Sequence, residues 1–252
     1  MSIDFFKQKY GYEIEDVWVP RVTAVTSLMY RGDVSFGFMR NAMNWGTLVH
    51  ETIQSMLQGE VVEVNPKIAP SIEAFDRWQK KNNFIVQDPL HAIEKRVSDS
   101  ENLYAGTIDI VAEMDGKRGI VDLKTSLEIS DHYALQTAAY LHAYNMGEQQ
   151  SLFPNIKYDA CETRWIVRID QYQECKGCLA RLREKSGKPV VREGRDSCNH
   201  QWSEVQGEIE CREFTNQEQD MQAFLAAKDV WEWQNKQWLK QIQNYPRNAV
   251  LV

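Results

Sequence analysis

The sequence predicts an α/β protein with a central mixed β-sheet flanked by helices. Helical patterns occur before, between and after four or five stretches that resemble strands. One pair of these strands is joined by a tight hairpin, so at least part of the sheet is antiparallel. An arrangement of this kind favours helix layers packed on a sheet.

Length and composition are those of an ordinary globular protein. The chain has 252 residues, of which 43% are hydrophobic and 26% charged, and we expect residues 1–252 to form a single domain. No apolar stretch approaches the roughly 20 residues that span a bilayer, and the first residues do not form a secretory signal. We therefore expect no membrane partner and a cytoplasmic location.

Charge and cysteine content narrow the function classes only slightly. The net charge of −7 argues mildly against a protein that coats nucleic acid, but it does not exclude an enzyme that grips a strand locally. Five cysteines without an export signal indicate thiols or metal ligands, not a disulfide framework.

Two amphipathic helices are predicted ahead of the sheet. The first covers 45–57, with Val49 and Ile53 at helical spacing and Thr47 as its N-cap. The second covers 69–83 and has an apolar stripe that faces inward.

The remaining elements follow in order along the chain. Strands are expected at 91–99, 103–114, 118–126, 163–170 and 207–214. A helix runs from Asp131 to about Met146 and is ended by Gly147. A long closing helix is expected over 216–242.

The hairpin between the two central strands places two acids opposite each other. Asp115 and Gly116 form a strong signal for a two-residue loop. In that register the numbers of cross-strand partners sum to 231, so Asp109 faces Asp122 with Cβ atoms about 5 Å apart.

Alternation along these strands separates a polar face from an apolar one. The face of the two acids also carries Thr107, Val111, Ile120 and Lys124. The opposite face pairs Ile108 with Leu123 and Ile110 with Val121, and it must be packed.

Facing carboxylates are destabilising unless a cation lies between them. Oxygen ligands of this kind suit Mg²⁺ or Mn²⁺. Such an ion lowers the pKa of a bound water and stabilises charge on a phosphate, and nearby Lys124 can orient or deprotonate that water or offset the phosphate charge. The pattern favours metal-dependent phosphodiester hydrolysis. The alternative is a surface hairpin whose solvent-exposed face carries these residues by chance.

Four motifs resemble those of the PD-(D/E)XK nuclease superfamily. "GTID" at 106–109 is followed by "DLKT" at 122–125. A preceding helix contains "GTLVHE" with His50, and a following helix contains "QTAAY" at 136–140. These flanking motifs make the chain most similar to the RecB-like branch, which includes phage and mitochondrial single-strand exonucleases. The motifs lie between about residue 20 and residue 170.

The resemblance implies a restriction-endonuclease-like core and a role for each matching residue. Metal ligands would be His50, Asp109, Asp122 and the backbone carbonyl of Leu123, and Lys124 would be the catalytic lysine beside Asp109 and Asp122. The side chains of Gln136 and Tyr140 would line the cleft, contacting the nucleic acid or bracing the lysine. Glu94, on the strand before the hairpin, is a weaker candidate for another acid of the site.

The function that the resemblance implies is a Mg²⁺- or Mn²⁺-dependent DNA exonuclease. Its partner would be single-stranded DNA or DNA ends, in recombination, repair or replication, together with proteins of those processes. Two alternatives remain: a non-catalytic nucleic-acid-binding or complex-assembly module on a nuclease fold, and a structure-specific endonuclease. Degenerate relatives usually lose the lysine or an acid, and this chain retains both.

A second candidate site lies in an inserted finger at 173–203. Cys175 and Cys178 are followed after nineteen residues by Cys198 and His200, a spacing typical of a structural zinc site. Cys211 is an alternative fourth ligand. An iron–sulfur cluster is not expected, because some RecB-like relatives take one ligand from a cysteine ahead of the first motif and this chain has none there. The finger either touches the phosphate backbone or is only a structural clasp; its candidate contacts are Lys176, Arg181, Arg183, Lys185 and Lys188.

Overall fold

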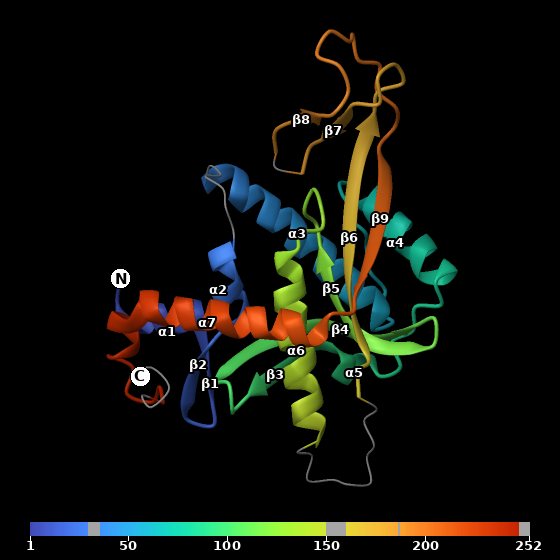
Figure 1. Ribbon diagram of the computed structural model, residues 1–252. Coiled ribbons are helices and arrows are strands. Elements are labelled where there is room, and N and C mark those ends of the chain that lie inside the picture. The colour runs from blue at the N-terminus through green and yellow to red at the C-terminus, as the bar shows by residue number, and fades with distance from the viewer. Residues whose placement is uncertain (30–35, 150–159, 186, 247–252) are drawn as a thin grey trace.

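The computed structural model describes residues 1–29, 36–149, 160–185 and 187–246. It has a mixed β-sheet with helices on both faces (Figure 1), which confirms the predicted α/β class. No helix of the described residues is long and apolar enough to cross a membrane.

The helices and strands alternate over most of the described chain. The helices are α1 (Ile3–Tyr10), α2 (Val22–Thr26), the 3₁₀ turn η1 (Ser27–Met29), α3 (Phe36–Leu57), α4 (Ala69–Lys81), α5 (Pro89–Ala92), α6 (His132–Gln149) and α7 (Gln217–Leu239). The strands are β1 (Gly11–Ile14), β2 (Val17–Pro20), β3 (Ile93–Asp99), β4 (Tyr104–Met114), β5 (Lys117–Lys124), β6 (Thr163–Glu174), β7 (Arg181–Arg183), β8 (Val190–Arg192) and β9 (Gln206–Phe214).

The main sheet has the order β3-β4-β5-β6, with β9 on the other side of β6. Only β5 and β6 are parallel, and α6 connects them. Strand β6 continues past the end of β5 and pairs with β9 as a two-stranded ribbon, which projects from the body and ends in β7 and β8 (Figure 1). The inserted finger is therefore the tip of a strand pair that begins beside the central hairpin.

Two apolar clusters cover the two faces of the sheet. Helices α6 and α7 pack on one face with Val111 and Ile120, and helices α3 and α4 pack on the other with Ile110 and Val121. These four residues lie on the faces that alternation predicts. Ile108 lies on the other face from the one predicted and joins the cluster of Val111. The regular alternation of β4 is interrupted at Asp109, whose side chain takes the place of a backbone carbonyl in the hydrogen-bonded ladder.

Three predicted element boundaries are wrong. Thr47 lies inside α3 and is not its N-cap, since the helix already begins at Phe36. Gly147 does not end α6, because its φ is not positive and the helix continues to Gln149; glycine inside a helix costs only about 1 kcal/mol. Strand β6 runs four residues beyond 170, because β9 and β7 supply it with partners there.

The N-terminal elements, which no sequence pattern predicted, pack with α7. Phe6 of α1 stacks on Trp238 with ring centroids 5.4 Å apart, and it also contacts Trp18 and Trp231. This aromatic group lies at the end of the molecule away from the ribbon (Figure 1).

A buried ionic cluster holds the base of the ribbon. Asp170 of β6 is fully buried, and its carboxylate lies 3.0 Å from both Arg168 Nη1 and Arg183 Nε and 2.5 Å from Lys185 Nζ. Burial alone would raise the pKa of Asp170, but Lys185 and Arg183 hold it below its ordinary value. The cluster joins β6 to β7 and to the loop that follows β7.

We predict that Asp170→Asn lowers the free energy of unfolding by about 3–5 kcal/mol, because it leaves buried cations without their counter-charge. Asp170 has a depressed pKa in the folded state, so its contribution is present above its ordinary pKa and is lost as the pH falls through the folded value. Urea unfolding of both proteins should therefore show a gap at pH 7 that narrows below about pH 4. A gap that stays constant down to pH 2 would contradict this account.

Candidate functional site

The central hairpin has the predicted register. Ile110 pairs with Val121 and Met114 with Lys117, and both pairs sum to 231. The two loop residues, Asp115 and Gly116, have φ of +50° and +78°, as a two-residue hairpin turn with right-handed strand twist requires.

Asp109 lies where the two strands of the hairpin begin to separate. The paired ladder ends at Ile110 and Val121, so Asp109 and Asp122 do not form the direct cross-strand pair that the sequence predicted. Asp109 Oδ2 accepts a 2.8 Å hydrogen bond from the backbone N–H of Leu123, so the carboxylate takes a place in the ladder that a backbone carbonyl would otherwise hold. Burial, and next the charge of Asp122, raise the pKa of Asp109 to about 8. The two acids are therefore close enough to oppose each other's ionisation.

Helix α3 brings His50 to this point. Neighbouring Val49 and Ile53 are fully buried and hold the helix against the sheet, and His50 Nδ1 lies 3.7 Å from Asp109 Oδ2. Burial lowers the pKa of His50 to about 4, although the charge of Asp122 opposes the shift. The imidazole is neutral at physiological pH, which is the form that binds metals.

Asp122 is fixed by α6. Gln136 Nε2 donates to Asp122 Oδ1 at 2.7 Å and lies 3.2 Å from the hydroxyl of Tyr140. The ring of Tyr140 lies against Gly106, where a Cβ atom would be 2.4 Å from the ring, so the "GTID" glycine makes room for it. Gln136 and Tyr140 are buried, and the Gln136 side chain braces Asp122; their expected place along a DNA cleft stays a prediction.

Lys124 completes this group from the end of β5. Its Nζ lies 2.5 Å from Asp122 Oδ2 and 4.9 Å from the centre of the Tyr133 ring. Burial alone would lower the pKa of Lys124, but Asp122 and Asp109 raise it above its ordinary value. The side chain is therefore a cation at neutral pH.

The structure also places Glu94 beside this group. The flanking pairs Ile93–Ile110 and Lys95–Ile108 put it opposite Asp109, and its φ is +52°. Its Oε1 lies 2.5 Å from Nε2 of Gln54, one turn after His50 on α3. Gln54 was not predicted from the sequence, although its spacing of four from His50 places both side chains on one face of α3.

His50, Asp109 in the middle of β4 and Asp122 near the end of β5 are side chains of the kinds that can bind a hard divalent cation. They supply a neutral imidazole and two carboxylates, and burial, followed by the charge of Asp122, raises the pKa of Asp109. Their ligand atoms do not form a tight group: the described residues contain one group of three or more His, Cys, Asp or Glu ligand atoms within 4.8 Å of one another, and it lies in the finger.

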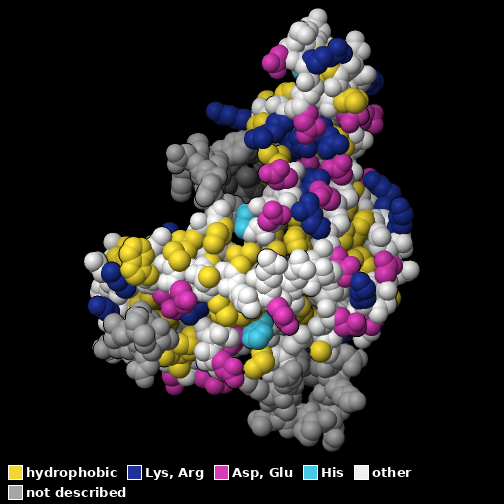
Figure 2. Space-filling view, in the orientation of Figure 1, with side chains coloured by type: hydrophobic (Ala, Val, Ile, Leu, Met, Phe, Trp, Pro, Cys, Tyr) yellow, Lys and Arg dark blue, Asp and Glu magenta, His cyan; other side chains and the backbone are white. Residues whose placement is uncertain are grey.

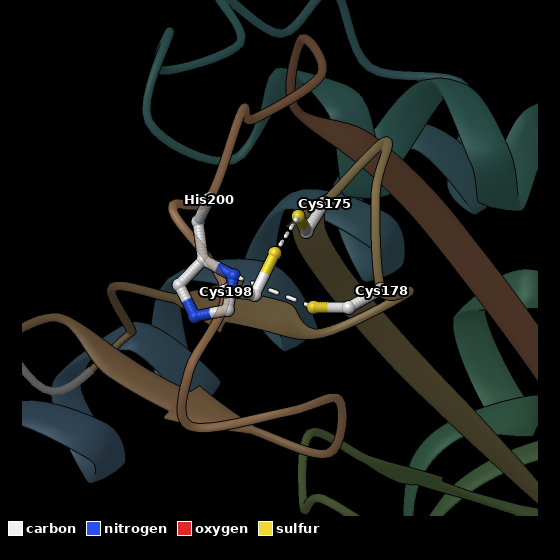
Figure 3. Close-up of side chains that lie close together, drawn as sticks. All are labelled: Cys175, Cys178, Cys198 and His200. Atoms are coloured by element: carbon white, nitrogen blue, oxygen red, sulfur yellow. Dashed lines mark hydrogen bonds between the residues drawn. The ribbon is translucent and has the colours of Figure 1, made fainter.

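That group consists of Cys175, Cys178, Cys198 and His200, whose ligand atoms point toward one another (Figure 3). The Sγ atoms of Cys175 and Cys198 are 3.8 Å apart, and Cys178 Sγ lies 3.4 Å from His200 Nδ1. Three thiols and an imidazole in this arrangement can hold a tetrahedral ion such as Zn²⁺.

Backbone amides prepare the first ligand pair for a metal. The N–H of Gly177 donates to Cys175 Sγ at 3.4 Å. Burial would raise the pKa of Cys175, but this contact and others lower it to about 6. Because the thiolate is the ligating form, Cys175 is ready to bind a metal at neutral pH.

Cys211 is not part of the finger site. It lies in β9 opposite Val167, packs against the apolar cluster under α3 and α4, and has a pKa raised to about 12 by burial. His200 and Cys211 were the two candidates for the fourth ligand, and the structure places His200 with Cys175, Cys178 and Cys198.

Most of the basic side chains proposed to touch phosphate have structural partners. Arg183 and Lys185 bind Asp170, and Arg181 pairs with Glu193 and Glu208. They are therefore poor candidates for contact with DNA. Exposed cations of the finger include Lys176, Lys188, Arg192 and Arg195, and Figure 2 shows Lys and Arg side chains gathered on the ribbon.

Comparison with models of protein families finds no match, and comparison with curated proteins finds none either.

We predict that the purified protein carries one zinc ion and that Cys198→Ser loses it, because three ligands hold zinc far more weakly than four. The matched control is Cys211→Ser, which should keep the zinc. Elemental analysis after gel filtration measures both. Equal zinc in the two variants would show that the finger group is not the site.

Proposed function

We propose that this chain is a metal-dependent DNA exonuclease with a PD-(D/E)XK active site, acting on single-stranded DNA or DNA ends. The observation that carries the proposal is the group at the end of the hairpin: Asp109 beside His50, and Asp122 paired with Lys124. These residues come from the matching motifs in their expected order along α3, β4, β5 and α6. The antiparallel strands β3, β4 and β5, followed by α6 and the parallel strand β6, support a restriction-endonuclease-like core.

His50, Asp109, Asp122 and the carbonyl of Leu123 would hold a Mg²⁺ or Mn²⁺ ion. When bound, such an ion lowers the pKa of the attacking water and stabilises the charge on the phosphate. The position of His50, whose Nδ1 lies 3.7 Å from Asp109 Oδ2, supports a cation at this place, because a neutral imidazole and a carboxylate are both metal ligands.

The chain's own residues position and stabilise the reacting groups. Gln136 holds Asp122, and the amide of Leu123 holds Asp109, so neither carboxylate has to reorganise when DNA arrives. Protonated Lys124 donates to a phosphate oxygen and stabilises the charge of the transition state. In the net reaction a water oxygen bonds to phosphorus, the bond to the leaving sugar oxygen breaks, and that oxygen takes up a proton.

The finger supports a DNA substrate by its local charge. Of the seven Lys and Arg in residues 173–203, Arg181, Arg183 and Lys185 are held in ion pairs, and the other four are exposed. Exposed cations such as Lys176 and Arg195 are available to neutralise phosphates.

A non-catalytic binding module is the weaker alternative. A module that only binds DNA has no need of a lysine paired with a buried aspartate close to a second acid. Lys124 and Asp122 form that pair here.

We predict that Lys124→Ala lowers the rate of DNA cleavage by about 10²–10³-fold or more, because it removes the cation that stabilises the transition state. The matched control is Lys117→Ala, at the exposed start of the same strand, which should cleave at the normal rate. End-labelled single- and double-stranded DNA with Mg²⁺ or Mn²⁺ is the assay, and circular dichroism checks the fold of both variants. Full activity in Lys124→Ala would end the proposal.

A further inference from the structure

Lys185 belongs to the finger, but its side chain returns to the body of the protein. It follows β7, and its side chain is 10% exposed. Its Nζ lies 2.5 Å from Asp170 Oδ1 and donates to the backbone carbonyls of Thr125 and Ile169 at 3.2 and 3.3 Å. It also lies 4.7 Å from the centre of the Trp45 ring.

These contacts join two elements of the candidate active site. Thr125 directly follows Lys124 at the end of β5, and Trp45 lies on α3, the helix of His50. Helix α3 packs closely on Thr125 between them: a Cβ atom on Gly46 would be 2.9 Å from Thr125 Oγ1. The ammonium group of Lys185 thus fixes the end of β5 relative to α3.

Asp170 keeps two cationic partners when Lys185 is replaced. Arg168 and Arg183 both bind the Asp170 carboxylate at 3.0 Å. A neutral side chain at position 185 therefore leaves this buried acid paired, and of the contacts that it removes, the one to Thr125 is the one that reaches the end of β5.

The finger's metal ligands enclose Lys185 in the sequence. Cys178 precedes it and Cys198 follows it, so a metal held by both ligand pairs closes the loop that contains Lys185. Closing a loop reduces the conformations open to it. The same loop rests on α3, where Gly187 approaches Asn41.

We propose that Lys185 is a positioning residue for cleavage and that metal in the finger holds it in place. This inference rests on the proposed nuclease function. The finger then acts on the active site from a distance: it clamps β5, with Asp122 and Lys124, against the helix that carries His50.

The first test compares Lys185→Met with the surface control Lys80→Met on α4. We expect Lys185→Met to lower kcat by about 10- to 100-fold with little change in KM, because small displacements of catalytic groups cost about this much. Lys185→Arg, which keeps a charged donor, should recover part of the loss. A normal kcat in Lys185→Met, or an equal loss in kcat and in DNA affinity, would overturn the proposal.

The second test does not need cleavage. Hydrogen exchange, followed by mass spectrometry on the peptide 119–126, should be faster in Lys185→Met and in zinc-free Cys198→Ser than in the zinc-loaded protein. The double variant should show no further increase, because both changes release the same contact. Unchanged exchange in either single variant, or additive effects in the double variant, would overturn the proposal. If the unaltered protein cleaves no DNA, the nuclease assignment fails, whereas this exchange experiment still decides whether the finger holds β5.

Discussion

The candidate active site depends on two carboxylates that lie close together where the central hairpin opens. The two-residue loop at Asp115 and Gly116 fixes the register as far as Ile110 and Val121, and Asp109 and Asp122 follow directly on the two strands. Three contacts offset the repulsion between these acids: the Leu123 amide and Gln136 donate to them, and Lys124 pairs with Asp122. Burial, and next the charge of Asp122, still raise the pKa of Asp109. In the proposed function, a divalent cation would let both acids ionise.

The two candidate metal-binding regions differ in how far the protein assembles them in advance. The finger gathers four ligand atoms within 4.8 Å of one another, as a site that holds its ion permanently requires. Asp122 and Asp109 at the hairpin are instead held by hydrogen bonds from Gln136 and from the Leu123 amide. Their ligand atoms form no such group. An ion with water and phosphate oxygens among its ligands needs that open arrangement.

The sequence predicted what local spacing determines. The turn residues gave the hairpin register, and the short intervals between Cys175 and Cys178 and between Cys198 and His200 gave the finger group. Contacts between residues far apart in the chain could not be predicted from the sequence. Gln54 and Glu94 are 40 positions apart and Thr125 and Lys185 are 60 apart, and no periodicity records such pairs. The face predicted for Ile108 was wrong for a related reason. Side chains alternate strictly only while the backbone hydrogen bonds of the ladder continue, and the Asp109 side chain interrupts them.

The proposed function has to be reconciled with the net negative charge of the chain. Some of its cations are used inside the fold: Arg168, Arg183 and Lys185 all bind one aspartate at the base of the ribbon. If the chain cleaves DNA as proposed, the exposed cations of the finger would bind a strand over a short length. A short contact would place more weight on the positions of the reacting groups, because binding energy from a long contact surface would not be available to align the substrate. The same ionic cluster contains Lys185, whose Nζ donates to the carbonyl of Thr125 just after β5. Buried charge in this fold therefore joins the finger to the strand that carries Asp122 and Lys124.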